Sequence, residues 1–309
     1  MNLTDPIYQD ADKAREHLER LHWPNGPVCP HCGSVENIKK LEGKSTRPGV
    51  YKCNACEKPF TVTVGTVMED SKIPLNKWVL AFALVNSSKK GISAHQLHRS
   101  LGITYKSAWF MHHRIREAMR MDKEPMGGLG HTVEADETYI GRDKTKPPNR
   151  TPIRHMNKVV SLVDRQTGVA RSFHVTDNLT ADTISRLLFT NVRRDSRLMT
   201  DEAHFYIRPG WDFAAHGRVA HAQEEYVSKL DRTVHTNTIE GFFSIFKRGM
   251  KGIYQHCGQQ HLQRYLHEFD FRYTFRAANG YDDAERTAVA LKGARGKRLT
   301  YRQPDYAAV

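Results

Sequence analysis

The sequence has no long apolar run and very little cysteine. No stretch of its 309 residues approaches the roughly 18 consecutive apolar residues that a membrane-spanning helix needs. The first twenty residues are polar and helix-forming, without the apolar segment of a secretory signal. Five cysteines without an export signal argue against a disulfide framework. These features exclude an integral membrane protein and predict a cytoplasmic location.

Acidic residues are also in deficit. The chain carries 47 Lys and Arg against 34 Asp and Glu, which gives a formal charge of +13 and a pI near 9.5. Such an excess favours a polyanionic partner and fast electrostatic association. Hydrophobic residues make up 39% of the chain, which is typical of a globular protein, and its length allows two or three domains.

Four of the five cysteines form two CxxC pairs, Cys29 with Cys32 and Cys53 with Cys56. The pairs are separated by 53 − 32 − 1 = 20 residues. Two knuckles at this separation predict a zinc ribbon, in which four thiolates hold one structural Zn²⁺. Zinc ribbons commonly contact nucleic acid, in agreement with the net charge. The remaining thiol, Cys257, is expected to be an ordinary buried or half-buried side chain.

A helical region follows the ribbon. Ser93 is placed to cap one helix, Gly102 to make a tight turn, and Thr104 to cap a second helix over 106–121. Two helices joined by a short glycine turn, the second of them basic, are typical of a helix-turn-helix. The predicted DNA contacts are Lys106, Arg114 and Arg116. A plain helical hairpin is the alternative.

After residue 130 the apolar period changes from about 3.6 to about 2, which indicates strands. The predicted elements are strands at 131–140, 157–164 and 169–176, a helix at 180–191, strands ending near 200 and covering about 217–222, and helices from 237. This order is typical of a ribonuclease-H-like α/β domain.

The predicted fold class is α/β, with a ribonuclease-H-like catalytic domain preceded by a zinc ribbon and a helical helix-turn-helix region. The predicted chain has five parts. An amphipathic helix over 6–22 opens the chain. The parts are an N-terminal segment 1–27, the ribbon 28–70, the helix-turn-helix region 71–125, the catalytic domain 131–278 and a basic tail 279–309. The last twenty residues, with Arg295, Lys297, Arg298 and Arg302, are expected to be poorly ordered.

Three acidic residues fall where this fold would place metal ligands: Asp136, Asp201 and Glu240. Mg²⁺ prefers carboxylate oxygens, and two ions can clamp the attacking and leaving oxygens of a phosphodiester. Strand alternation puts Glu134 on the same face as Asp136, and Glu137 on the other. Spacing therefore leaves Glu134 open as an alternative ligand, and Glu202 likewise beside Asp201.

Several segments, taken in order, resemble bacterial insertion-sequence transposases of the DDE superfamily with an N-terminal zinc ribbon, the fifteen-ninety-five insertion-sequence family. The matching segments are the two CxxC pairs, 58–66, 133–141, 200–202, 235–251 and 261–269. The resemblance implies that Asp136, Asp201 and Glu240 bind Mg²⁺ or Mn²⁺. It also implies that Lys247, two helical turns after Glu240, contacts a DNA phosphate, with Arg248 and Lys251 extending the basic surface.

The resemblance further implies an activity and partners. The ribbon and the helix-turn-helix would recognise the terminal inverted repeats of the element. The acidic site would cut the DNA at the element end and join the exposed 3′-hydroxyl to a target strand. Synapsis of two ends predicts a homodimer or a larger assembly on DNA, acting at the bacterial nucleoid. The alternatives are a ribonuclease-H-like nuclease or resolvase, which cleaves without joining, and a zinc-ribbon DNA-binding regulator.

Overall fold

The computed structural model describes residues 2–121, 124–143, 155–219, 227 and 231–300. The chain divides into two compact units. The first consists of Met1–Arg120 and Tyr281–Val309, and the second of Met121–Gly280. Among the described residues, no helix has both the length and the apolar character that crossing a membrane requires.

The ribbon of the first unit is a small antiparallel sheet. Its strands, in the order β1-β2-β3, are Ile38–Lys40, Tyr51–Cys53 and Pro59–Phe60. Three rings pack beside it: the Trp23 and Tyr51 centroids lie 5.3 Å apart, and those of Tyr51 and Phe60 5.7 Å apart. A sheet this small buries too little apolar surface to be stable alone, so the aromatic cluster and the four cysteines must supply most of its stability.

Six helices make up most of the described remainder of the first unit. They are α1 Pro6–Gln9, α2 Ala11–His22, α3 Leu75–Ser87, α4 Ala94–Leu101, α5 Tyr105–Ala118 and α10 Asp283–Lys292. The predicted helix over 6–22 is interrupted at Asp10. This residue has extended backbone angles, and its carboxylate accepts from the backbone N–H groups of Asp12 and Lys13, so it caps a second helix rather than continuing the first.

The predicted helix-turn-helix signals are confirmed locally. The Ser93 side chain accepts from Gln96 N at the start of α4, and Gly102 ends that helix in the left-handed conformation at φ 57° and ψ 45°. Thr104 caps α5 by accepting from Ser107 N. Helix α5 ends at Ala118, three residues earlier than predicted.

The expectation that the last twenty residues are poorly ordered is wrong for 290–300, the part of them that the structure describes. Helix α10 ends in this segment, and its Leu291 is completely buried. Beyond the helix, the Arg295 guanidinium donates to the carbonyl oxygen of His22 at 2.8 Å. Basic side chains that bond to helix-terminal carbonyls hold a chain segment in place. Arg302 lies outside the described residues.

The second unit is built on a five-stranded mixed sheet in the order β6-β5-β4-β7-β8. Its strands are β4 Thr132–Ile140, β5 Asn157–Asp164, β6 Ala170–Val175, β7 Arg197–Asp201 and β8 Ala215–Val219. The pairs β4–β5 and β5–β6 are antiparallel, and β4–β7 and β7–β8 are parallel. The predicted α/β ribonuclease-H-like fold is confirmed. The last strand starts earlier than predicted, and positions 220–222 lie outside the described residues.

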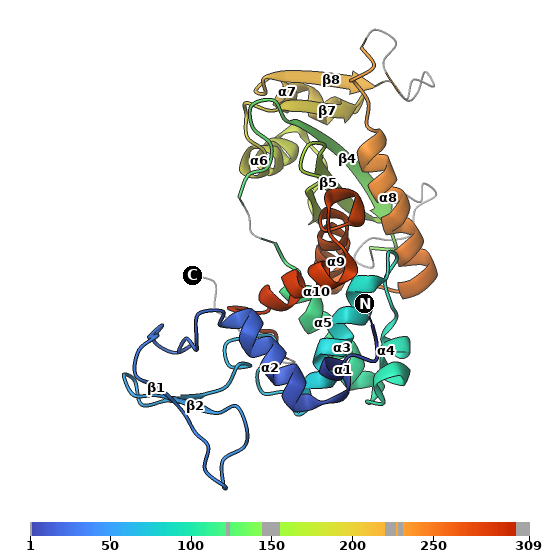
Figure 1. Cartoon of the computed structure of the whole chain (residues 1–309). Coiled ribbons are helices and arrows are strands. Elements are labelled where there is room, and N and C mark those ends of the chain that lie inside the picture. The colour runs from blue at the N-terminus through green and yellow to red at the C-terminus, as the bar shows by residue number, and fades with distance from the viewer. Residues whose placement is uncertain (1, 122–123, 144–154, 220–226, 228–230, 301–309) are drawn as a thin grey trace. The chain divides into compact units, whose positions relative to one another are not determined.

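Helices cover both faces of this sheet (Figure 1). On one face, α6 Ala181–Asn191 packs with the short helices η2 His204–Tyr206 and α7 Ile207–Gly210. On the other lie α8 Asn237–Gly249, a π-helical turn η4 Met250–Tyr254, a 3-10 turn η5 Gln259–His261 and α9 Leu262–Thr274, followed by a 3-10 turn η6 Ala277–Asn279. Side chains of β4 alternate between the two layers: Val133 and Ala135 pack toward α6, and Ile140 packs toward α8.

Candidate functional site

The parallel pairing of β4 and β7 brings two predicted acids together. Thr132 is level with Arg197, and Asp136 and Asp201 each follow four residues later (136 − 132 = 201 − 197 = 4). The two carboxylates therefore leave the sheet at the same height on neighbouring strands. Carboxylate oxygens of Asp136, Glu137 and Asp201 all lie within 4.8 Å of one another, a spacing that a divalent cation can bridge.

The cluster is strained electrostatically without a cation. Burial raises the pKa of Asp136 to about 8, with further contributions from the charges of Glu137, Asp201 and Glu240. Burial and the charge of Asp201 raise the pKa of Glu137 to about 7. Neighbouring carboxylates that resist ionisation are expected where a bound cation normally compensates their charge. The donor set is made only of hard oxygens and fits Mg²⁺ or Mn²⁺.

Glu137 belongs to this cluster although strand alternation pointed it away from Asp136. It accepts a hydrogen bond of 3.1 Å from the hydroxyl of Tyr206, which is fully buried. Tyr206 comes from η2, just after β7. Carboxylates from both faces of β4 therefore meet at this level, where β7 ends at Asp201. In the sequence, the only indication that Glu137 belongs to the site is that it directly follows Asp136.

The alternative ligand Glu134 has a different place. Its side chain is completely buried, accepting from Arg165 Nε at 2.6 Å and from the backbone N–H of Ile239 at 2.8 Å. Ile239 lies in the first turn of α8, where an anion is favoured by the exposed N–H groups. Glu134 thus anchors the start of α8 to the sheet. The other alternative, Glu202, is exposed.

Glu240 lies in the first turn of α8, where its carboxylate accepts from the hydroxyl of Thr236 at 3.0 Å. It is close enough for its charge to raise the pKa of Asp136. It is not part of the cluster within 4.8 Å. The structure therefore brings Asp136 and Asp201 together with Glu137, and holds the third predicted acid on the adjacent helix.

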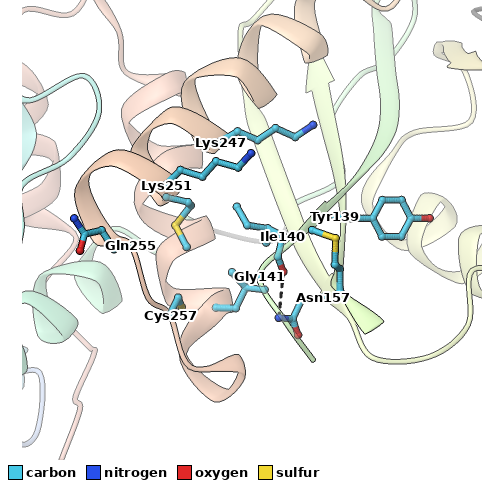
Figure 2. Close-up of a pocket in the computed structure, with 11 residues that line it drawn as sticks. Tyr139, Ile140, Gly141, Asn157, Lys247, Lys251, Gln255 and Cys257 are labelled. Carbon is cyan, nitrogen blue, oxygen red and sulfur yellow. Dashed lines mark hydrogen bonds between the residues drawn. The ribbon is translucent and has the colours of Figure 1, made fainter. Parts of the chain in front are cut away.

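The predicted basic residues of α8 and its extension are exposed. Lys247 Nζ lies 5.9 Å from the centroid of the Phe243 ring, and Arg248 Nε donates to the carbonyl oxygen of Ser244. Lys247 and Lys251 both line a pocket beside the end of β4, and Figure 2 shows their side chains extending in the same direction. The helix therefore presents cations toward solvent beside the strand that carries Asp136.

The four ribbon cysteines are brought together as predicted. All four sulfur atoms lie within 4.8 Å of one another, and the Sγ atoms of Cys29 and Cys56, and of Cys32 and Cys53, are 3.7 Å apart. A tetrahedral site with Zn–S bonds of about 2.3 Å has S–S edges of about 3.8 Å. Backbone N–H groups, that of Cys56 foremost, lower the pKa of the Cys53 thiol to about 7. The pKa of the Cys32 thiol is raised to about 12, because a backbone hydrogen bond from Ser34 is outweighed by hydrogen bonds with the neighbouring sulfurs. The donor set fits Zn²⁺.

The helix-turn-helix differs from the prediction in which basic residues face outward. Lys106 is exposed in the first turn of α5. Arg116 is only 1% exposed, and the Arg114 guanidinium donates to the carbonyl oxygens of Leu299 and Glu69 at 3.1 and 2.9 Å. The C-terminal half of α5 packs into the unit, so Arg114 and Arg116 stabilise its interior instead of presenting charge to DNA.

Comparison with known proteins gives two family matches. The model of the ISXO2-like transposase domain matches residues 128–274. The model of the transposase zinc-ribbon domain matches residues 9–59. The two matched ranges contain the acidic cluster with Glu240 and Lys247, and the four ribbon cysteines, respectively.

Two individual proteins also match this chain, at low sequence identity. The chain is 27% identical over 275 residues to an uncharacterized protein in transposable element ISH50 of Halobacterium salinarum, covering 84% of this chain and 90% of that protein. A solved structure of the simian T-cell lymphotropic virus intasome, in complex with PP2A regulatory subunit B56 gamma, contains a chain that matches at 15% identity with a TM-score of 0.30. That match covers 56% of this chain and 63% of the other.

Proposed function

Because this chain belongs to the fifteen-ninety-five family of insertion-sequence transposases, we propose that it binds the terminal inverted repeats of its element and catalyses metal-dependent strand cleavage and strand transfer. The observation that carries the proposal is the convergence of Asp136, Glu137 and Asp201 within 4.8 Å. Half-buried carboxylates this close together repel one another, and a bound cation would compensate their charge.

Each residue has a distinct role in the proposal. Asp136 and Asp201 would hold the catalytic Mg²⁺ or Mn²⁺ ions together with Glu240 from α8, and Glu137 would share in this ligation. Bound ions would supply charge stabilisation for the attacking and leaving oxygens of the phosphodiester. Lys247 would hold a DNA phosphate next to the acids. Glu134 acts indirectly, because it fixes the helix that carries Glu240.

The first unit would supply end recognition. Its ribbon would hold one structural Zn²⁺, and the exposed first turn of α5 is the part of a helix-turn-helix that enters the major groove. Lys106 lies there beside Tyr105, whose side chain is 43% exposed and stacks on His95 at 4.2 Å. Joining two element ends would require at least a homodimer on DNA. The place of action would be the bacterial nucleoid in the cytoplasm.

The test is a cleavage and joining assay with Mg²⁺ and a labelled duplex carrying the element's own end. Wild type should cut the end and join it to a second DNA, and Asp136→Ala should do neither. Glu202→Ala is the matched control, because it removes an exposed carboxylate next to Asp201, and it should retain both steps. Cleavage without joining would indicate a nuclease or resolvase. Binding without metal-dependent cleavage in wild type would refute a catalytic role.

A further inference from the structure

A pocket of about 360 Å³ lies in the second unit (Figure 2). The ends of β4 and α8, the start of β5, the η4 turn and the start of α9 enclose it. Ile140, Met250 and Leu262 supply buried apolar walls. The volume is at the lower end of the range for small-molecule sites, which runs from about 300 to 1,000 Å³. Its size and walls suit one small, partly apolar group.

One polar group in the wall lacks a partner. Asn157 is 4% exposed, and its Nδ2 donates to the Ile140 carbonyl oxygen at 3.2 Å. Its Oδ1 is buried and accepts no hydrogen bond from the residues that the structure describes. A buried acceptor without a donor costs about 1–3 kcal/mol. This oxygen is closed off from the pocket, so a ligand N–H would reach it only after the Asn157 side chain rotates.

The rim of the pocket is positively charged and locally strained. Lys247 and Lys251 lie four residues apart and are both exposed, and like charges at this helical spacing repel each other. Gln255 lines the same rim with φ at +57°, an unfavourable angle for a side-chain-bearing residue, and such strain is concentrated at functional sites. The π-helical turn between them is also a feature often found at such sites. An anionic ligand would relieve the lysine repulsion.

The pocket stands at a defined distance from the acids. Ile140 follows Asp136 by four strand residues, about 13 Å, and lies on the same face of β4. Lys247 follows Glu240 by seven helical residues, about 10 Å. Strand and helix thus lead from the acids to the pocket over similar lengths. A DNA strand rises about 3.4 Å per nucleotide, so this distance corresponds to roughly three or four nucleotides.

We propose that this pocket binds a single unstacked nucleobase of the DNA strand whose phosphate lies at the acidic site. The base would insert between the apolar walls beside Asn157, while Lys251 holds its flanking phosphate and Lys247 holds the next phosphate toward the acids. Unstacking a base costs a few kcal/mol and is recovered by such pocket contacts. The proposal rests on the proposed function, because it takes the DNA to be positioned with its reacting phosphate at Asp136 and Asp201.

The experiment uses the full chain and duplexes carrying the element's end. 2-Aminopurine, whose fluorescence rises on unstacking, is placed at each of the positions flanking the cleavage site. A second duplex series carries a disulfide-tethered base at the same positions. Cys257 lines the pocket, so the tether should exchange with its thiol when the base enters. Cys257→Ser is the control that must abolish this cross-link.

One position, three or four nucleotides from the reacting phosphate, should both brighten several-fold and cross-link to Cys257. A bulky substitution of the half-buried Met156, Met156→Trp, should suppress the fluorescence rise at that position while the first unit still binds the end. If this variant does not fold, the two scans in wild type decide. Wild type that cleaves the unmodified end while no position both brightens and cross-links would overturn the pocket assignment alone. Wild type that does not cleave would overturn the proposed function, and the base site with it.

Discussion

Replacing Asp136 by asparagine should stabilise the metal-free protein at neutral and alkaline pH. The amide keeps the oxygen that accepts from Glu137 N at 2.7 Å and removes a charge that repels Glu137 and Asp201. The pKa of Asp136 is raised from an ordinary 3.8 to about 8. The folded protein therefore holds a proton that the unfolded chain has lost, and the free energy of unfolding falls as pH rises from about 4 to about 8.

The size of the effect follows from the pKa difference. One pKa unit corresponds to about 1.36 kcal/mol, so a difference of 8 − 3.8 has an upper limit near 6 kcal/mol. Water entry and relaxation around partly buried charges reduce such values severalfold, because the effective dielectric constant is close to 20. We expect the free energy of unfolding of Asp136→Asn to exceed that of wild type by roughly 1–3 kcal/mol at pH 8. At pH 5 the difference should be much smaller.

The assay is denaturant unfolding of both proteins in chelator from pH 5 to 8.5, monitored on the transition of the second unit. Mn²⁺ should then stabilise wild type more than the variant, because the cation binds the folded carboxylates. Glu202→Gln is the matched control and should show no such pH-dependent gain. A variant that is less stable than wild type at pH 8 without metal would show that the carboxylates do not repel each other, and the reasoning would fail.

Three further predictions concern the remaining sites. Cys53→Ser should lose the one zinc per chain and unfold the ribbon, whereas Cys257→Ser should keep the zinc. Metal analysis by emission spectrometry distinguishes the two variants, and a folded wild type without zinc would contradict the assignment. Lys106→Ala should weaken binding to the element end and reduce the slope of log affinity against log salt concentration by about 1. Arg116→Ala should instead lower thermal stability, because its guanidinium is buried. Salt-dependent binding titrations and melting curves test both variants, and an unchanged slope in Lys106→Ala would count against the DNA contact. Glu134→Ala should lower the free energy of unfolding by about 1–3 kcal/mol, because the backbone N–H of Ile239 loses its acceptor, while Arg165 keeps its bonds to the carbonyl oxygens of Thr233 and His235. Denaturant unfolding measures the change, and a neutral result would show that α8 is held by other contacts.

The sequence alone determined those features that depend on interactions between residues close together in the chain. The cysteine spacing specified the four-sulfur cluster, because each CxxC turn brings two sulfurs together. Ser93, Gly102 and Thr104 specified the turn between α4 and α5, because caps and left-handed glycines act within a few residues. The apolar period located β5 at 157–164 and α6 within one residue. The order of these elements was enough to identify the ribonuclease-H-like fold.

Tertiary structure decided what each charged side chain faces. Strand alternation separated Glu137 from Asp136, but the carboxylates of both lie within 4.8 Å of that of Asp201. By strand position, Glu134 was as good a candidate metal ligand as Asp136. In the structure its carboxylate instead accepts hydrogen bonds from Arg165 and from the backbone at the start of α8. Arg116 looked like a DNA contact, but its half of α5 is packed into the first unit. Sequence period gives the direction in which a side chain leaves its own element. Which neighbour, if any, lies in that direction is set by elements distant in the chain, and burial and pKa depend on that neighbour.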